Sequence, residues 1–339
     1  MGEGLQALRK FLDEKKDDVI VLADKHTLAD CYPLLLEDVP HFIVPYGETY
    51  KNIDSCEYIW KMLTQLGATR KSILVCLGGG VLCDMGAYAA TCYQRGMRVA
   101  LVPTSLLAMV DAAVGGKNGV NFMGLKNYVG TFREPDYSFT CPEFLKTLPA
   151  HEMTNGYVEM LKHGLIADKA HYDAVKMYFL NNNLAMTEEL IQHSITIKKN
   201  HVAQDFKDNG VRKRLNFGHT VGHAIESYSV GHSDENEAFS HGVSVALGIL
   251  AECYLSAQLV GFSEEALHEV SIVLQPILSS LNNDIPTFEQ IRPYLLKDKK
   301  NTSDKVNFSL LKSIGDCEHD HEVELELVKQ SIDYLVGLV

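Results

Sequence analysis

Short apolar runs alternate with helical stretches through the first 150 residues of this 339-residue chain. Four runs are rich in β-branched residues and bounded by polar, glycine or proline residues, which is typical of buried parallel strands: VIVLAD (19–24), HFIVPY (41–46), SILVCLG (72–78) and RVALVP (98–103). Helical periodicity marks residues 1–18, 52–67 and 81–95. This alternation predicts a doubly wound, Rossmann-like α/β domain over residues 1–149, with ligands at the carboxyl ends of its strands.

The pattern changes near residue 150. Residues 151–297 show almost only helical periodicity, and a short strand (305–314) and a last helix (324–338) follow. We therefore expect a second, all-helical domain over residues 150–339.

Composition excludes several classes of protein. Hydrophobic residues make up 46% and charged residues 22%, as in globular proteins, and the N-terminus has no apolar signal core. No apolar run reaches about 18 residues, so we expect no membrane span. Eight scattered cysteines without a C-x-x-C pair indicate reduced thiols in the cytoplasm. A net charge of −13 without a long basic run argues against a nucleic-acid partner.

Two histidines lie four residues apart in LNFGHTVGHAIESY (215–228), where a helix would put both on one face. The zinc-protease pattern H-E-x-x-H is excluded, because a threonine follows His219. Alone, the pair His219 and His223 fits a metal site and a polar helix face equally. Glu159 and His241 could join His219 in a two-histidine, one-carboxylate set, which leaves a catalytic zinc an open position. Lys162, three residues after Glu159, could form an ordinary surface ion pair with it, but the mostly apolar neighbours favour an inward-facing pair.

Glycine-rich segments suggest phosphate sites in the first half. Gly78-Gly79-Gly80 follow a strand, which fits either a nucleotide loop or a tight turn, and Cys83 stands where the dinucleotide fingerprint has its last glycine. Asp111 lies in an apolar helical stretch, where an unpaired carboxylate would be unfavourable. Gly115-Gly116-Lys117 and Lys126-Asn127 follow in a polar, glycine-rich loop that suits a phosphate or is a mobile surface loop.

Together these motifs resemble the 3-dehydroquinate synthase family of sugar phosphate cyclases. The resemblance runs from about Asp24 to the C-terminus and rests on GGGVLCD, YQRG, VPTSLLAMVDAAVGGKNGVN, LKN, TLPAHE, GYVEMLKHGLI, IKK, RKRLNFGHTVGHAIE, SHG and DKK. It implies an NAD-binding α/β domain and a helical metal- and substrate-binding domain. It also implies a cytoplasmic homodimer with NAD, one divalent metal ion, usually zinc with cobalt as an alternative, and a phosphorylated, carboxylated sugar as substrate.

The implied activity is that of a carbon–oxygen lyase acting on phosphate. It converts 3-deoxy-D-arabino-heptulosonate 7-phosphate to 3-dehydroquinate and phosphate, the second step of the shikimate pathway to chorismate and the aromatic amino acids. NAD is reduced and reoxidised within each turnover.

The resemblance also assigns roles to residues. Glu159, His219 and His241 match the metal ligands, so that His223 serves the substrate. The remaining substrate contacts fall on Lys162 and Asn216 (hydroxyls), Lys198 and Arg212 (carboxylate), Lys117 and Asn127 with His223 (phosphate), Arg95 from a partner subunit, and Lys299 of the Lys299-Lys300 pair. NAD contacts fall on Asp24, Glu48, Lys51, Gly79, Gly80, Asp84, Thr104, Ser105, Asp111, Lys117, Lys126, Thr147 and Glu152.

Five positions depart from the family pattern. Cys83 and His26 replace a glycine and an asparagine beside NAD, Asn118 and Leu125 replace a threonine and a glycine in the phosphate loop, and Phe206 replaces an acid. Three rival functions are a sister cyclase acting on another heptulose phosphate such as sedoheptulose 7-phosphate, a metal-dependent alcohol or glycerol dehydrogenase, and a non-catalytic binding protein. Lys198 and Arg212, which suit a carboxylate, argue against the sister cyclase. The phosphate motifs argue against the dehydrogenase.

Overall fold

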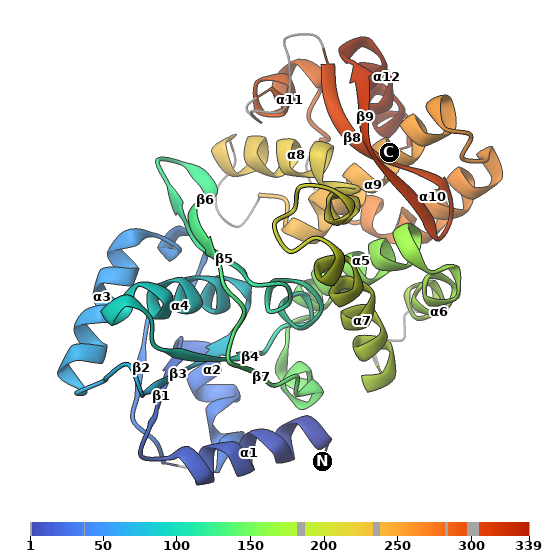
Figure 1. Ribbon diagram of the computed structural model, residues 1–339. Coiled ribbons are helices and arrows are strands. Elements are labelled where there is room, and N and C mark those ends of the chain that lie inside the picture. The colour runs from blue at the N-terminus through green and yellow to red at the C-terminus, as the bar shows by residue number, and fades with distance from the viewer. Residues whose placement is uncertain are drawn as a thin grey trace. The chain divides into compact units, whose positions relative to one another are not determined.

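The computed structural model describes residues 2–36, 38–181, 187–232, 238–281, 284–296 and 305–338. The chain divides into two compact units, Met1–Met153 and Thr154–Val339 (Figure 1). The division falls inside helix α5 (Ala150–Ala167).

The first unit is built on a parallel five-stranded sheet with the order β2-β1-β3-β4-β7. The strands are β1 (Val19–Ala23), β2 (His41–Ile43), β3 (Ile73–Gly78), β4 (Arg98–Pro103) and β7 (Tyr137–Ser138). The helices are α1 (Glu3–Lys15), α2 (Lys25–Asp30), α3 (Ile53–Gln65) and α4 (Gly80–Cys92), with short 3-10 turns η1 (Tyr32–Leu35), η2 (Glu48–Tyr50), η3 (Tyr93–Arg95) and η5 (Pro142–Thr147) and a π turn η4 (Ala108–Ala112). All residues of β1 and β3 are buried, as their continuous apolar runs predict.

Helix α4 packs closely on the sheet at Gly86. A Cβ added there would lie 2.4 Å from Cys76 Sγ on β3. Cys83, one turn earlier, is buried and its Sγ contacts the carbonyl oxygen of Gly78 at 3.5 Å. Close helix–sheet packing, the usual task of the last fingerprint glycine, therefore falls to Gly86 in this chain, and Cys83 is accommodated.

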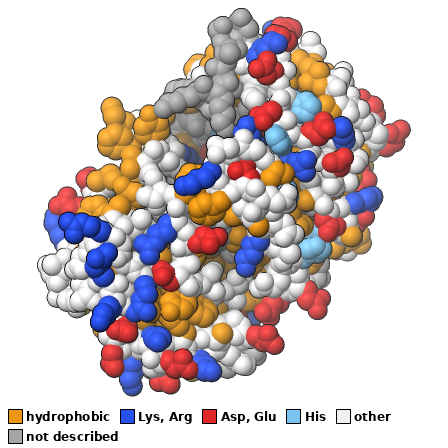
Figure 2. All heavy atoms as spheres, viewed as in Figure 1, with side chains coloured by type: hydrophobic (Ala, Val, Ile, Leu, Met, Phe, Trp, Pro, Cys, Tyr) orange, Lys and Arg blue, Asp and Glu red, His pale blue; other side chains and the backbone are white. Residues whose placement is uncertain are grey.

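Gly115 and Gly116 lie in a loop, as predicted, but residues 117–132 form an antiparallel hairpin, so the predicted loop is wrong from Lys117 onward. Strands β5 (Lys117–Phe122) and β6 (Leu125–Phe132) are joined at Met123 and Gly124, which have φ of 50° and 76°, as a two-residue hairpin turn requires. Leu125 begins β6, so position 125 needs no glycine conformation. Figure 2 shows hydrophobic side chains over this hairpin, where Phe122, Met123, Tyr128 and Phe132 are exposed.

The hydrogen bonds of Asn118 account for the asparagine at this position, where the family pattern has a threonine. Its amide donates to the carbonyl oxygens of Gly116 and Arg133, both at 3.2 Å, and its Oδ1 accepts from Thr131 Oγ1 at 2.5 Å. The side chain is buried and stabilises the hairpin.

The second unit is mainly helical. It contains most of α5 followed by α6 (Lys169–Leu180), α7 (Glu188–Gln204), η6 (Val211–Asn216), α8 (His219–His232), α9 (His241–Leu259), α10 (Glu264–Leu278), α11 (Phe288–Leu295) and α12 (Leu325–Val336). In the described part of the chain, α9 alone is long and apolar enough to cross a membrane, but 72% of its 18-residue apolar window is buried inside the protein, as in a core helix. The predicted fold class, an α/β domain followed by a helical domain, is confirmed.

One strand of the second unit escapes the sequence analysis. β8 (Lys305–Ser313), which was predicted, pairs antiparallel with β9 (Asp316–Glu324), which was not. Of the nine residues of β9, only Cys317 and Val323 are buried, so it lacks the apolar alternation that identifies a strand.

All eight cysteines are free thiols. Seven are buried and Cys92 is exposed. Burial raises the pKa of Cys31 and Cys56 to about 12, which keeps these thiols protonated and unreactive.

Candidate metal and cofactor sites

Three side chains of the second unit converge on one point. Glu159 on α5 is fully buried, and its Oε1 lies 3.3 Å from His219 Nε2 on α8 and 3.4 Å from His241 Nε2 on α9. One ligand atom from each residue lies within 4.8 Å of the others. Two imidazole nitrogens and one carboxylate oxygen are the donor set of a catalytic zinc site.

The environment of the Glu159 carboxylate favours the binding of a cation. Its Oε2 pairs with Lys162 Nζ at 2.5 Å, and its Oε1 has no partner in normal hydrogen-bond geometry among the described residues. Burial alone would raise the pKa of Glu159, but the charge of Lys162 and then the two histidines outweigh it and hold the pKa well below its usual range. The inward-facing Glu159–Lys162 pair inferred from the sequence is thus present, and an ionised, under-coordinated buried oxygen fits a metal ion.

The two histidines differ electrostatically. Burial and then the charge of Lys162 lower the pKa of His219 well below its usual range, so its ring is neutral and Nε2 can donate to a metal. Burial alone would lower the pKa of His241, but the neighbouring carboxylates of Glu159 and then Glu226 raise it to about 10.

Neighbouring groups orient the ligands. His241 Nδ1 lies 3.6 Å from Glu226 Oε1, and His219 Nδ1 lies 3.2 Å from the carbonyl oxygen of Phe217. Asn155 Oδ1 accepts from Ser240 Oγ and from the backbone N–H of Gly242, both at 2.8 Å, which fixes the start of α9. Such outer contacts set the tautomer and direction of metal-binding histidines.

His223 is not a member of the group formed by Glu159, His219 and His241. Its side chain is exposed, and its ring centroid lies 4.9 Å from that of His219 and 6.1 Å from that of His241. It forms a second possible ligand group with Glu226 and His241, not with Glu159. The structure therefore brings together the three predicted metal ligands and leaves His223 beside them.

Most of the described residues that are predicted to bind substrate in the second unit are buried. Lys162 donates to the carbonyl oxygen of Leu215 at 2.8 Å, one residue before the half-buried Asn216. Lys198 on α7 and Arg212 on η6 are buried cations. Two buried cations suit an anionic ligand, which would compensate their desolvation. Lys299 lies outside the described residues.

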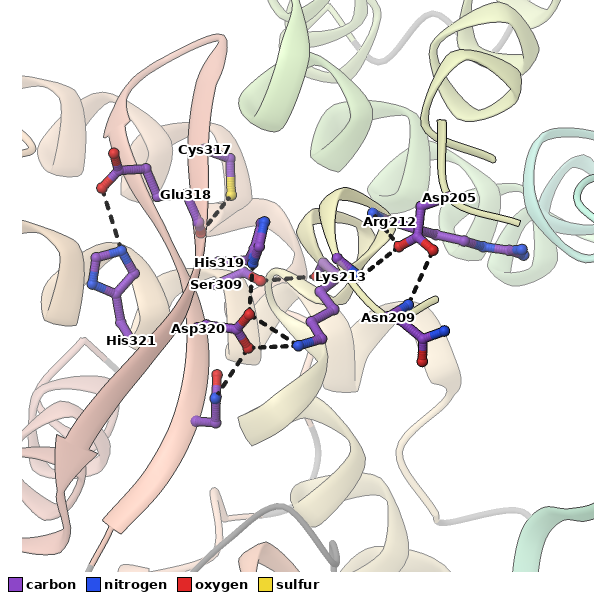
Figure 3. Close-up of polar contacts among 12 residues, drawn as sticks. Asp205, Asn209, Arg212, Lys213, Ser309, Cys317, Glu318, His319, Asp320 and His321 are labelled. Carbon is purple, nitrogen blue, oxygen red and sulfur yellow. Dashed lines mark hydrogen bonds and ion pairs between the residues drawn. The ribbon is translucent and has the colours of Figure 1, made fainter. Parts of the chain in front are cut away.

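The segment that carries Arg212 is held at both ends (Figure 3). The carboxylate of Asp205 accepts from the backbone N–H groups of Asn209, Gly210 and Arg212 at 3.1, 2.7 and 3.2 Å. Arg212 Nη1 donates to the carbonyl oxygen of Phe206 at 2.8 Å, so position 206 contributes a backbone contact that any side chain permits.

On the other side, Lys213 binds the carboxylate of Asp320 on β9 at 2.8 and 2.9 Å, and its carbonyl accepts from Ser309 Oγ of β8 (Figure 3). The predicted strand β8 and the unpredicted strand β9 thus both anchor η6.

In the first unit, the sheet order places one of the predicted NAD residues at the end of the strand next to the glycine loop. β1 and β4 flank β3, whose carboxyl end carries Gly79 and Gly80. Asp24 follows β1 directly and caps α2 by accepting from the backbone N–H groups of His26 and Thr27 at 2.8 and 3.0 Å. Asp24 therefore stands after a strand that neighbours β3 in the sheet and precedes it in the chain.

A polar network joins other predicted residues of the first unit. The buried Lys51 donates to Asp84 Oδ2 and to Asn127 Oδ1, both at 2.6 Å. Asn121 links Glu48, at 2.8 Å, to the backbone N–H of Asn127, at 2.9 Å. Burial alone would lower the pKa of Lys51, but Asp84 and then Glu48 raise it, so the lysine stays charged. Asn127, predicted at a substrate phosphate, is thus tied to residues predicted to bind NAD.

The remaining predicted residues of the first unit are more dispersed. Thr104 and Ser105 are buried after β4, where Thr104 N donates to the carbonyl oxygen of Gly78 at 3.0 Å. Asp111 is half-buried in the π turn η4, not in a regular helix. Thr147 is exposed and Glu152 half-buried at the start of α5, while Lys117 and Lys126 are exposed on the hairpin and Arg95 is exposed at the end of η3.

Three residues that support the candidate metal site without belonging to the Glu159 set escaped the sequence analysis: Asn155, Glu226 and Glu252. The sequence contained a signal for Glu252, because it lies in the apolar stretch that forms α9. A carboxylate there needs polar partners, as Asp111 does in its own apolar stretch. Glu226 lies seven residues after His219, on the same helical face, which its sequence position could have revealed.

The sequence comparison decides the family. The profile of the 3-dehydroquinate synthase N-terminal domain matches residues 41–155, and that of the C-terminal domain matches residues 156–301. The 3-dehydroquinate synthase of Parabacteroides distasonis is 39% identical over 96% of this chain and 94% of its own length. This chain belongs to the 3-dehydroquinate synthase family. The 3-dehydroquinate synthase of Rippkaea orientalis is 38% identical over 87% of this chain and 81% of its own length.

Solved structures show the same fold at lower identity. The 2-epi-5-epi-valiolone synthase of Streptomyces hygroscopicus, with NAD+ and Zn2+ bound, matches with a TM-score of 0.84 and 21% identity over 94% of this chain and 91% of that one. A 2-deoxy-scyllo-inosose synthase with carbaglucose-6-phosphate, NAD+ and Co2+ matches with a TM-score of 0.80 and 22% identity over 96% and 94% of the two chains.

Proposed function

We propose that this protein is a 3-dehydroquinate synthase that converts 3-deoxy-D-arabino-heptulosonate 7-phosphate to 3-dehydroquinate and phosphate, as a carbon–oxygen lyase of the shikimate pathway. The observation that carries the proposal is the Glu159, His219 and His241 cluster together with the buried cations Lys198 and Arg212 in the same unit. The cluster suits a metal that binds substrate oxygens, and the cations suit a carboxylate.

A divalent metal ion, zinc by preference, would be held by Glu159, His219 and His241, and NAD by the polar groups at the strand ends of the first unit. When bound, the metal would lower the pKa of a substrate hydroxyl, and NAD would accept and return the hydride. Support comes from the donor set and from related cyclases that hold NAD+ with Zn2+ or Co2+.

The protein's own groups would hold the two ends of the substrate. Arg212, whose guanidinium is fixed by the carbonyl of Phe206, can grip a carboxylate with two parallel hydrogen bonds, and Lys198 adds charge. Lys162, fixed by Glu159 and Leu215, would orient substrate hydroxyls, with Asn216 beside it. Lys117, Asn127 and His223 would bind the phosphate, so that it leaves in a defined direction.

A homodimer would complete the site through Arg95. Gln94 and Arg95 have φ of 49° and 66°, an unfavourable conformation for two consecutive non-glycine residues, and Arg95 is exposed. Such strain is typical of functional positions. Mixed Arg95→Ala and Lys162→Ala subunits, each inactive alone, should regain activity in hybrid dimers. No recovery after verified subunit exchange would show that Arg95 acts within its own chain or not at all.

A sister cyclase and a dehydrogenase are separated from this proposal by one assay. With 3-deoxy-D-arabino-heptulosonate 7-phosphate, metal and sub-stoichiometric NAD, we expect many equivalents of phosphate and no lasting rise in NADH absorbance. Stoichiometric NADH without phosphate release would indicate a dehydrogenase. Phosphate release from sedoheptulose 7-phosphate alone would indicate a sister cyclase.

A further inference from the structure

A buried glutamate of α9 binds the start of α8. Glu252 has no exposed surface, and its Oε2 accepts from the backbone N–H of Gly218 at 2.6 Å. Its Oε1 accepts from the backbone N–H groups of Thr220 and Val221 at 3.1 and 3.2 Å. One carboxylate thus receives three N–H groups around the first residue of α8, which is His219.

Glu252 replaces a local helix cap. The first N–H groups of a helix have no partner inside it, and a preceding polar side chain normally accepts them. Gly218, with φ of 78°, has no side chain for this task. The side-chain oxygens of Glu252 on α9 accept from these groups in place of a local cap.

The two helices also touch through their backbones. A Cβ added at Gly248 of α9 would lie 1.9 Å from the carbonyl oxygen of Gly218, and one added at Gly222 of α8 would lie 2.9 Å from the carbonyl oxygen of Ser244. At such close contact, the direction of α8 is set by what α9 presents to it. His241 is the first residue of α9, so both histidines of the metal cluster depend on this packing.

We propose that Glu252 is a positioning residue for the metal centre: it holds the start of α8 so that His219 Nε2 faces Glu159 Oε1 and His241 Nε2. The inference rests on the proposed function, because it concerns the metal that this function requires. It assigns Glu252 no contact with metal or substrate.

The test is metal binding by the full-length Glu252→Gln protein. Glutamine keeps the shape but presents an NH2 group to at least one backbone N–H, so the start of α8 should shift. We expect the dissociation constant for Zn2+, measured by chelator competition, to rise about 10- to 100-fold. The visible absorption of the Co2+-loaded protein should also change, because its bands report ligand geometry.

Ser256→Ala is the matched control. Ser256 lies one turn further along α9, is buried, and its Oγ bridges the carbonyl of Glu252 and the N–H of Leu311 at 2.6 and 2.9 Å. Its loss should lower the melting temperature but leave the Zn2+ affinity and the Co2+ spectrum unchanged.

Wild-type affinity and spectrum in Glu252→Gln would overturn the inference. If that variant is not recovered folded, Glu252→Asp, which withdraws the carboxylate by one methylene, is judged by the same two readouts. Failure of the wild-type protein to bind Zn2+ or Co2+ at all would instead overturn the proposed metal centre.

Discussion

The candidate sites of the two units differ in how completely they are formed. In the second unit, Glu159 is fully buried and fixed by Lys162, and the histidines that face it are held by further buried groups. In the first unit, Lys51 is buried, but its partner Asn127 lies on an exposed hairpin, and Lys117 and Lys126 are exposed. The metal cluster is therefore preorganised, whereas a nucleotide would have to complete the other site. Substitutions should accordingly abolish function in the second unit and weaken binding in the first.

The largest expected effect is loss of the metal. His219→Ala and His241→Ala each remove one of three ligands, so purified protein should retain less than about a tenth of the wild-type metal content. His223→Ala is the control, since it removes an exposed histidine outside the Glu159 set, and it should keep the metal and lose turnover. Metal analysis decides. A metal-free His223→Ala with a fully loaded His241→Ala would refute the ligand assignment.

A smaller effect is expected for Lys51→Met in the first unit. The change removes charge-assisted hydrogen bonds to Asp84 and Asn127, each worth about 1.5–3 kcal/mol. We expect the dissociation constant for NAD to rise at least about 10-fold, with metal content unchanged. Lys61→Met, which removes an exposed pair with Glu57, is the control and should bind NAD normally. Equal NAD affinity in both variants, measured by calorimetry, would remove Lys51 from the cofactor site.

The second unit should also lose stability in acid because of His171. Burial and then His193 lower the pKa of His171 to about 4, and neither ring nitrogen has a hydrogen-bond partner among the described residues. Between pH 6.5 and 4 the unfolded chain therefore binds more protons at this residue. Stability is full above pH 6.5 and falls by up to about 3 kcal/mol as the pH drops through this window.

His171→Phe should remove this pH dependence. Unfolding by urea, followed by circular dichroism, measures it. The only tryptophan of the chain, Trp60 on α3, reports the first unit by its fluorescence. An unchanged pH slope in His171→Phe would assign the acid sensitivity to other groups.

The smallest effect concerns the anchor of η6. Lys213 above all, and then His319, lower the pKa of Asp320 to about 2, but the Asp320 side chain is 40% exposed, so solvent screens the pair. Asp320→Asn should lower stability by less than about 1 kcal/mol at pH 7. Because the folded pKa is depressed, this contribution is present above about pH 4 and vanishes as the pH falls through 2. A difference between variant and wild type that persists below pH 2 would mean that the ion pair is not its source.

The sequence predicts those features of the structure that follow from neighbouring residues in the chain, and it misses those that depend on distant contacts. β1 and β3 are recognisable because every residue in them is buried. The predicted metal ligands Glu159, His219 and His241 lie on three different helices, so local spacing left the set open and the family resemblance assigned it. The adjacency of β1 and β3, which brings Asp24 to the glycine loop, is a property of sheet order that no local pattern contains. The same holds for Glu252, whose partners lie more than thirty residues earlier in the chain. β9 was missed because its residues are mostly polar and make their contacts with β8 and η6.

The distribution of thiols provides a single native site for attaching a spectroscopic label. Cys92 is the one exposed cysteine of the eight, and it lies three residues before Arg95. A thiol-reactive dye on the unaltered sequence would therefore attach beside the strained turn that is proposed to meet a second subunit. Its emission colour and tumbling rate would report assembly in real time, and no engineered cysteine or removal of the other seven would be needed.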